Sequence, residues 1–219
     1  MKTLVIAPHP DDELLGVGGT LLRRKLEGGT VTWLIVTAIL EEYGWQKERI
    51  VKRKEEIRKV AEIMGFDDVI ELKYPTACLD MSMLSQLVGD IGSVVDKIKP
   101  DEVFVPHIGD IHSDHYIVHK AAVSNSKWFR HNSVKRLLAY ETLSETDFGL
   151  DQVFSPNVYI NIENFLQKKL DALQVYESEI KNFPFPRSKE AVIALAKLRG
   201  AASGYAAAEA FKLLREREG

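Results

Sequence analysis

Two hydrophobic patterns alternate along the chain. Short apolar runs rich in β-branched residues are typical of buried strands, and they cover residues 3–7, 31–37, 69–72, 102–106, 137–141 and 158–162. Between these runs, apolar residues recur at helical spacing. This spacing predicts helices at 14–26, 47–64, 84–98 and 116–129, and further helices within 162–176 and 190–216.

The repeated order of strand, helix and strand predicts right-handed crossovers and a largely parallel sheet. We therefore expect an α/β fold, with residues 1–219 forming a single Rossmann-like three-layer domain. A chain of 219 residues can bury a core without a disulfide or a structural metal. Ligands of such sheets bind beyond the carboxyl ends of the strands, which here are the loops that follow Ala7 and Val105.

Composition narrows the classes of function. The net charge of −3 argues against a dedicated nucleic-acid-binding protein, because such proteins usually present a basic face. The single cysteine, Cys78, excludes an intramolecular disulfide and a cysteine-rich zinc site. The longest apolar stretch, residues 31–40, falls short of a membrane span, and the N-terminal one is too short for a signal peptide. We expect a cytoplasmic protein.

The first loop crowds one imidazole and three carboxylates into His9, Pro10, Asp11, Asp12 and Glu13. One interpretation is a helix N-terminus capped by Asp11 or Asp12. Capping needs one aspartate only, and it needs no histidine. The prolines on both sides of His9 stiffen its backbone, which suits a fixed ligand.

Glycines follow this loop at positions 16, 18 and 19. A dinucleotide-binding loop would need a further glycine where Leu21 stands, and no phosphate-binding lysine of the Walker type follows. We therefore expect these glycines to allow close packing of a helix on the sheet.

The second loop concentrates histidine: four of the six fall between positions 107 and 119. This clustering indicates a metal or catalytic site. His115 and His119 have the helical spacing of a zincin, but Tyr116 stands where a zincin has glutamate. We expect His119 to be a structural helix residue.

Together the two loops hold the parts of a metal-dependent hydrolase. Catalytic zinc usually takes three protein ligands and keeps one position open, and His9, Asp12 and His115 can supply those ligands. Asp11 then remains as a base, and His112 as an acid or an oxyanion donor. Asp114 could hold an imidazole in one tautomer.

The motif His-Pro-Asp-Asp-Glu at 9–13, with Asp-x-His-x-Asp-His at 110–115, resembles the PIG-L/LmbE-like zinc-dependent N-deacetylases. These enzymes act on N-acetylglucosaminyl phosphatidylinositol and on conjugates of N-acetylglucosamine with malate or inositol. Weaker similarities follow in the family's order: Arg53-x-x-Glu56, residues 156–159, Tyr176-x-Ser178 and a C-terminal helix containing residues 208–211.

The resemblance implies one Zn²⁺ per chain, bound by His9, Asp12 and His115, with Asp11 as general base. It implies that His112 stabilises the oxyanion or protonates the amine, with Asp114 as the carboxylate that orients it. Arg53 matches an arginine that contacts substrate in some members of the family. A helix salt bridge with Glu56 is an alternative role for Arg53.

The sequence departs from the family's pattern at Ser113, at residues 37–39, at Glu179 and at Ala207. These changes affect the expected substrate and the lip of the pocket rather than the metal chemistry. We expect a zinc-dependent N-deacetylase that removes acetyl from an N-acetylated amino sugar or its conjugate, and that self-associates into a homo-oligomer. A zinc amidase cleaving a larger acyl amide is one alternative, and a non-hydrolytic sugar-nucleotide-binding protein is another.

Overall fold

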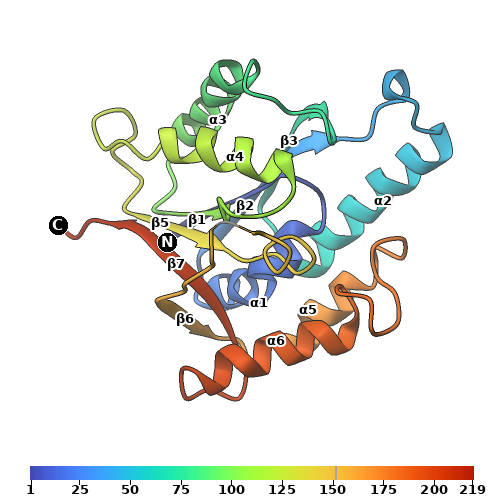
Figure 1. Cartoon of the computed structure of the whole chain (residues 1–219). Helices are drawn as coiled ribbons and strands as arrows, with labels where there is room; N and C mark the ends of the chain where they lie inside the picture. The colour runs from blue at the N-terminus through green and yellow to red at the C-terminus, as the bar shows by residue number, and fades with distance from the viewer. Residues whose placement is uncertain (151) are drawn as a thin grey trace.

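A seven-stranded sheet lies between two layers of helices in the computed structural model, which describes residues 1–150 and 152–219 (Figure 1). The strands are β1 (Lys2–Ala7), β2 (Thr30–Ala38), β3 (Asp68–Pro75), β4 (Glu102–Pro106), β5 (Arg136–Tyr140), β6 (Val158–Asn161) and β7 (Ala208–Glu216). The helices are α1 (Asp12–Leu26), α2 (Lys47–Met64), α3 (Leu84–Ile98), α4 (Ser113–Ser124), α5 (Leu166–Leu173) and α6 (Lys189–Ala201), with a short 3-10 helix η1 (Glu41–Tyr43). The predicted α/β fold is confirmed.

The strand order is β3-β2-β1-β4-β5-β7-β6. Every neighbouring pair from β3 to β5 is parallel, and β7 runs antiparallel to both β5 and β6. Strands β2 and β3 lie on one side of β1, and β4, the next strand along the chain, lies on the other side of β1. In a sheet of this kind, the ligand crevice lies where the order reverses, beyond the carboxyl ends of β1 and β4.

The two faces of the sheet form two separate hydrophobic cores. Successive side chains of a strand point to opposite faces, so Val5 packs in one core while Leu4 and Ile6 pack in the other. The core around Val5 and Trp33 also contains residues of α1, α2 and α5, and the core around Leu34 contains residues of α3 and α4. Figure 1 shows α3 and α4 on one side of the sheet, with α1, α5 and α6 on the other.

The glycines of α1 serve helix packing, as the sequence predicts. A Cβ atom on Gly16 would lie 2.9 Å from the carbonyl oxygen of Glu141, and one on Gly19 would lie 2.7 Å from the Cβ atom of Ile162. Because glycine has no side chain, α1 lies closer to β5 and to the chain after β6 than it could with any other residue at positions 16 and 19.

The predicted helical structure between residues 190 and 216 is wrong in its second half. Helix α6 ends at Ala201, Gly204 takes a left-handed conformation with φ +78°, and β7 follows. Alanines dominate the start of β7, and alanine favours helix on its own. Tertiary context overrides that propensity, because this segment fills the gap between β5 and β6.

Among the residues that the structure describes, none of the helices is both long enough and apolar enough to cross a lipid bilayer.

Candidate metal centre and active-site pocket

Two loops meet at the reversal point of the sheet. The segment after β1 carries His9, Asp11 and Asp12, and the segment between β4 and α4 carries His112, with His115 in the first turn of α4. These residues come from positions about 100 apart in the sequence, and the pairing of β1 with β4 brings them together.

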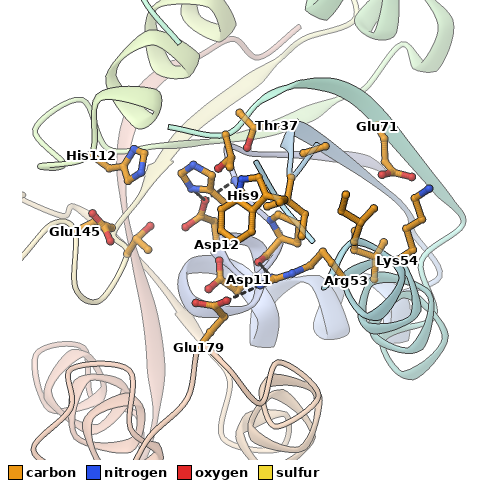
Figure 2. Close-up of a pocket in the computed structure, with 18 of the residues that line it drawn as sticks. His9, Asp11, Asp12, Thr37, Arg53, Lys54, Glu71, His112, Glu145 and Glu179 are labelled. Atoms are coloured by element: carbon orange, nitrogen blue, oxygen red, sulfur yellow. Dashed lines mark hydrogen bonds and ion pairs between the residues drawn. The ribbon is translucent and has the colours of Figure 1, made fainter. Parts of the chain in front are cut away.

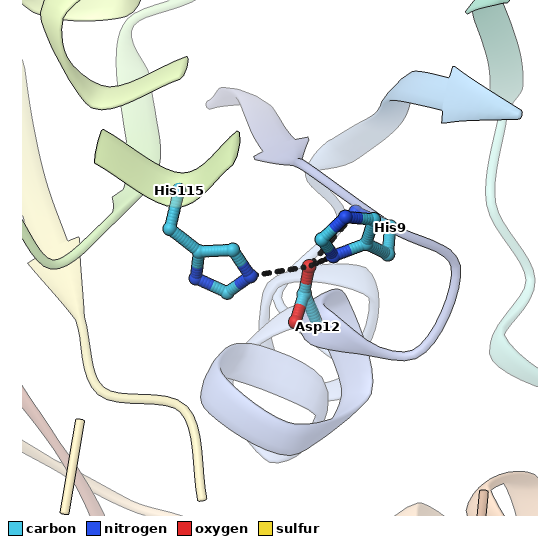
Figure 3. Close-up of side chains that lie close together, drawn as sticks. All are labelled: His9, Asp12 and His115. Atoms are coloured by element: carbon cyan, nitrogen blue, oxygen red, sulfur yellow. Dashed lines mark hydrogen bonds and ion pairs between the residues drawn. The ribbon is translucent and has the colours of Figure 1, made fainter. Parts of the chain in front are cut away.

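Three of them form a compact set of metal-ligand atoms (Figure 3). Asp12 Oδ2 lies 3.3 Å from His9 Nδ1 and 3.3 Å from His115 Nε2. The three ligand atoms lie within 4.8 Å of one another. In the described part of the chain, the buried Nε2 atom of His115 has no hydrogen-bond partner. An orphaned buried nitrogen beside a carboxylate and a second imidazole suits a bound cation, so the residues fit the expected zinc.

A carboxylate holds the second nitrogen of each of these histidines. His9 Nε2 lies 3.0 Å from Asp114 Oδ2, and His115 Nδ1 lies 2.7 Å from Asp110 Oδ2. Carboxylates in this position fix the ring and its tautomer, so that the other nitrogen faces the metal. The two aspartates therefore aim His9 Nδ1 and His115 Nε2 at Asp12.

This geometry corrects the expected partner of Asp114. Its carboxylate contacts His9 and accepts hydrogen bonds from the backbone N–H groups of Ala77 and Leu79, at 2.7 and 3.1 Å. The contact with His112 is made by the backbone N–H of Asp114 instead. Helix α4 begins at Ser113, three residues before the predicted start, so Asp114 lies in its first turn, where its carboxylate reaches His9, Ala77 and Leu79.

His112 is the N-cap of α4. Its Nδ1 atom accepts the backbone N–H of Asp114 at 3.1 Å, so in the neutral ring the proton is on Nε2. Burial lowers the pKa of His112 to about 4, and the charges of His9 and His115 act in the same direction. His112 therefore lines the pocket as a neutral donor (Figure 2).

Asp11 occupies the N-cap position of α1, but its carboxylate makes no cap hydrogen bond. Its own N–H donates to Glu13 Oε2 at 3.0 Å, and its Oδ2 atom accepts from Arg187 Nη1 at 2.9 Å. The backbone of Asp11 is strained, with φ 127° and ψ −27°. Burial, and after it the charge of Asp12, raise the pKa of Asp11 while Arg187 opposes both, which leaves the pKa at about 7.

Arg53 is surrounded by protein groups. Its Nη1 atom donates to the carbonyl oxygen of Pro10 at 3.0 Å, and its Nη2 atom donates to Glu179 Oε1 at 2.5 Å. The Nε atom lies 3.2 Å from Glu56 Oε2, so the alternative salt bridge is present while Arg53 also lines the pocket. The structure places Arg53 in the wall beside Pro10.

The sequence interpretation missed the roles of Asp110, Glu179 and Arg187. Asp110 stands in the histidine-rich motif, and its spacing of five from His115 was a usable signal. Glu179 and Arg187 come from the chain between α5 and α6, where only the prolines at 184 and 186 marked a break. His119 behaves as predicted, because its buried Nδ1 atom contacts the carbonyl oxygen of Pro106 at 2.8 Å.

A cavity of about 250 Å³ opens in front of the metal-ligand set (Figure 2). Its walls come from the β1–α1 loop, the end of β2, α2, β3, His112 and the chain after β5. The charged side chains that line it, besides His9, His112 and Asp12, are Asp11, Arg53, Lys54, Glu71, Glu145, Glu179 and Arg187. Carboxylates outnumber cations, which leaves room for a metal cation to balance the charge.

The family model described as GlcNAc-PI de-N-acetylase (PIG-L) matches residues 4–126, which span both halves of this centre. The chain belongs to the PIG-L/LmbE-like deacetylase family. This PIG-L-family protein is 24% identical over 223 residues to the diacetylchitobiose deacetylase of Thermococcus kodakarensis, covering 97% of this chain and 83% of that protein.

Two further relatives of this PIG-L-family protein match most of its length. A probable N-acetyl-alpha-D-glucosaminyl L-malate deacetylase 2 of Bacillus anthracis is 24% identical over 188 residues, which cover 80% of each chain. The crystal structure of the conserved protein TT1542 from Thermus thermophilus is 26% identical and superposes with a TM-score of 0.80, covering 99% of this chain and 96% of that one.

Proposed function

We propose that the protein is a zinc-dependent hydrolase that removes the acetyl group from an N-acetylated amino sugar or its conjugate. One observation carries the proposal. Two imidazoles, each held by its own carboxylate, converge on Asp12, and the buried carboxylate of Asp11 lies free of any cap beside them. Membership of a deacetylase family supports the same reaction.

His9 Nδ1, Asp12 Oδ2 and His115 Nε2 would hold one Zn²⁺ per chain, because they form a three-ligand set of the kind that catalytic zinc uses. When bound, such a zinc polarises the amide carbonyl and lowers the pKa of a coordinated water.

Asp11 is the general base in this proposal. A base works best when its pKa lies near the working pH, and burial together with the neighbouring charges places the pKa of Asp11 at about 7. Arg187 holds the Oδ2 atom of Asp11 at 2.9 Å, so the carboxylate keeps one orientation in the pocket. Asp11 accepts the proton of the attacking water and then delivers it to the leaving nitrogen.

His112 supplies the oxyanion donor rather than the acid. Its Nδ1 atom is occupied by the backbone N–H of Asp114, so only the Nε2–H group can face a substrate oxygen. A neutral donor placed where negative charge develops stabilises the transition state without giving up its proton. The proton of the leaving amine therefore comes from Asp11.

The test is a screen of N-acetylated sugars and conjugates on the zinc-loaded protein, scored by free amine and by acetate. Wild type is compared with Asp11→Asn, which keeps the shape of the side chain but cannot accept the proton. We expect Asp11→Asn to retain zinc and its melting temperature while kcat falls by roughly 10²–10⁴, the usual contribution of a general base.

Asparagine caps helices about as well as aspartate, so a capping role for Asp11 predicts an unchanged kcat in the same variant. Loss of zinc in Asp11→Asn would instead show that Asp11 is a ligand. Release of a bulky acyl group in preference to acetate would favour the amidase. Cytoplasmic location and self-association remain predictions, to be tested by fractionation and by light scattering.

A further inference from the structure

The two histidines of the proposed zinc site are held in different ways. The carboxylate of Asp114, which contacts His9, accepts two backbone N–H groups from the chain after β3. The carboxylate of Asp110, which contacts His115, accepts no backbone N–H group among the described residues, and its Oδ1 atom lies 2.6 Å from the hydroxyl oxygen of Thr146. Backbone donors are present whatever the side chain, whereas this hydroxyl depends on one residue. No step of the proposed reaction uses Thr146.

The direction of each hydrogen bond around Thr146 follows from its partners. Its Oγ1 atom accepts the backbone N–H of Thr142 at 2.8 Å, and a carboxylate can only accept. The single hydroxyl proton of Thr146 is therefore donated to Asp110 Oδ1. Because Asp110 Oδ2 lies 2.7 Å from His115 Nδ1, a continuous chain of hydrogen bonds runs from the backbone of Thr142 to the imidazole of His115.

The turn that carries Thr146 lies directly against the loop between β4 and α4. The backbone N–H of Ile111 donates to the carbonyl oxygen of Glu145 at 3.1 Å. A Cβ atom on Gly149 would collide with the carbonyl oxygen of Gly109, so the two segments touch through their backbones there as well. Glu145 itself lines the pocket (Figure 2). The backbone on both sides of Thr146 is fixed in this way, and its hydroxyl is held at the carboxylate.

Burial makes this hydroxyl important to Asp110. The side chain of Asp110 is fully buried, as is that of His115. A buried carboxylate oxygen without a donor is unfavourable, so without the hydroxyl of Thr146 the carboxylate would turn toward another partner. His115 Nδ1 would then lose the contact that fixes the orientation and tautomer of the ring.

We propose that Thr146 is a positioning residue of the zinc site. Its hydroxyl holds Asp110, and through Asp110 it keeps the Nε2 atom of His115 directed at Asp12. Thr146 itself contacts neither a metal ligand atom nor, in the proposed reaction, the substrate. This inference rests on the proposed function for the metal that these residues bind.

The experiment measures the dissociation constant of Zn²⁺ by competition with a chelator, together with the melting temperature of the zinc-free protein. Thr146→Val removes the hydroxyl and nearly keeps the shape of the side chain, whereas Thr146→Ser keeps the hydroxyl. Partners of metal-bound histidines usually contribute about 10–100-fold in affinity, and Thr146 acts one contact further away. We therefore expect the dissociation constant to rise on the order of tenfold in Thr146→Val and to stay within about twofold of wild type in Thr146→Ser.

Thr142→Val is the matched control, because it removes a hydroxyl from the same turn. The Oγ1 atom of Thr142 is buried and has no hydrogen-bond partner among the described residues. The contact of Thr142 with Thr146 is made by its backbone N–H, which valine retains. We expect the zinc dissociation constant of Thr142→Val to stay within about twofold of wild type, since this hydroxyl holds no partner of a histidine.

A double-mutant cycle tests whether Thr146 acts through Asp110. In an Asp110→Ala protein the hydroxyl has no carboxylate to hold, so the two substitutions should not be additive. We expect Thr146→Val to change the zinc dissociation constant by less than about twofold in the Asp110→Ala background.

Three results would overturn the proposal. The first is a zinc dissociation constant that Thr146→Val leaves unchanged, even if the zinc-free protein melts at a lower temperature, because Thr146 would then only stabilise its turn. The second is an affinity that Thr146→Ser fails to retain, and the third is an undiminished effect of Thr146→Val in Asp110→Ala. Tight zinc binding by wild type without release of amine from any N-acetylated sugar would overturn the proposed function instead, and the zinc affinities would still decide the role of Thr146.

Discussion

At the scale of single residues, the active site is organised by the partners of its histidines. Asp114 and Asp110 each contact the outward nitrogen of one proposed zinc ligand, at 3.0 and 2.7 Å. Both carboxylates are buried, so each can act only on the group it contacts. The orientation of His9 and His115 therefore depends on residues that bind no metal themselves.

Asp114→Asn tests this dependence. The substitution keeps the size of the side chain but weakens its hold on His9, so we expect zinc affinity to fall by about 10–100-fold, as for comparable partners of metal-bound histidines. Zinc titration followed by competition with a chelator measures the change. If the variant bound zinc like wild type and lost turnover only, Asp114 would act on His112, as the sequence suggested.

Arg187→Met tests the control of Asp11. Asp11 acts as a base only when it is ionised, so turnover is lost as pH falls through its pKa, and Arg187 keeps that pKa from rising further. Without Arg187 the acid limb of kcat/KM therefore moves to higher pH, while activity at pH 9 changes less. Arg58→Met, on the exposed face of α2, is the control. Superimposable pH profiles for wild type and Arg187→Met would contradict this role.

The sequence predicted the metal-ligand set because the chemistry lay in two short motifs, each at the end of a strand. It did not place Arg187, since nothing local marks a residue so far along the chain as a neighbour of Asp11, and it connected Glu179 with the lip of the pocket only through the family's pattern. It also did not reveal that the carboxylate of Asp114 contacts His9. The N-terminal limit of α4 decides where Asp114 points, and an N-cap made by a histidine leaves little trace in composition.

At the scale of elements, α1 matters most, because its first turn holds Asp12 and Glu13 while its next turns lie against β5. Gly16 permits this approach, and an added Cβ atom would meet the backbone oxygen of Glu141 at 2.9 Å. The backbone directly after β5 cannot move aside as the end of a flexible side chain could. The contact between α1 and β5 therefore limits what can stand at position 16.

Gly16→Ala and Gly89→Ala make a matched pair. We expect Gly16→Ala to lower the free energy of unfolding by about 1–3 kcal/mol through overpacking, and to reduce turnover by shifting the first turn of α1. Gly89 lies exposed in α3 with open space around it, so Gly89→Ala is expected to stabilise by roughly 0.5–1 kcal/mol. Urea denaturation measures both changes. If the two substitutions changed the free energy of unfolding in the same direction, the proposed role of Gly16 in packing would be refuted.

The C-terminal strand shows the limit of sequence analysis at this scale. Residues 208–211 favour helix by composition, yet they lie in β7. Glu209 of this strand accepts the backbone N–H groups of Gly19 and Thr20 at 2.8 and 2.7 Å, and it pairs with the buried Lys169 at 2.7 Å. These contacts come from α1 and α5, so no local pattern could have revealed them.

At the scale of the whole molecule, we expect the fold not to depend on the metal. Two extended cores on the two faces of the sheet give a chain of 219 residues enough buried surface to fold alone. Zinc should therefore add stability by binding the folded state, in proportion to its concentration over its dissociation constant. The parallel pairing of the first five strands was predictable from the alternation of strands and helices, because such crossovers are right-handed and short.

His115→Ala separates the metal from the fold. We expect the variant to remain folded, to lose most of its zinc, and to show no rise in melting temperature when zinc is added. His119→Ala is the control. His119 is buried and contacts Pro106, but it belongs to neither set of possible metal ligands, so this variant should lose stability and keep zinc. Full zinc occupancy in His115→Ala, measured by elemental analysis, would refute the ligand assignment.

The left-handed backbone of Asp11 has an evolutionary consequence. A non-glycine residue in such a conformation costs on the order of 1–3 kcal/mol, and glycine would relieve much of that cost. A laboratory selection for heat resistance alone would therefore favour glycine at position 11 and enrich inactive proteins. Thermal stability and catalysis place opposite demands on this residue. Engineering of a more thermostable variant should therefore keep Asp11 and introduce stabilising substitutions at other positions.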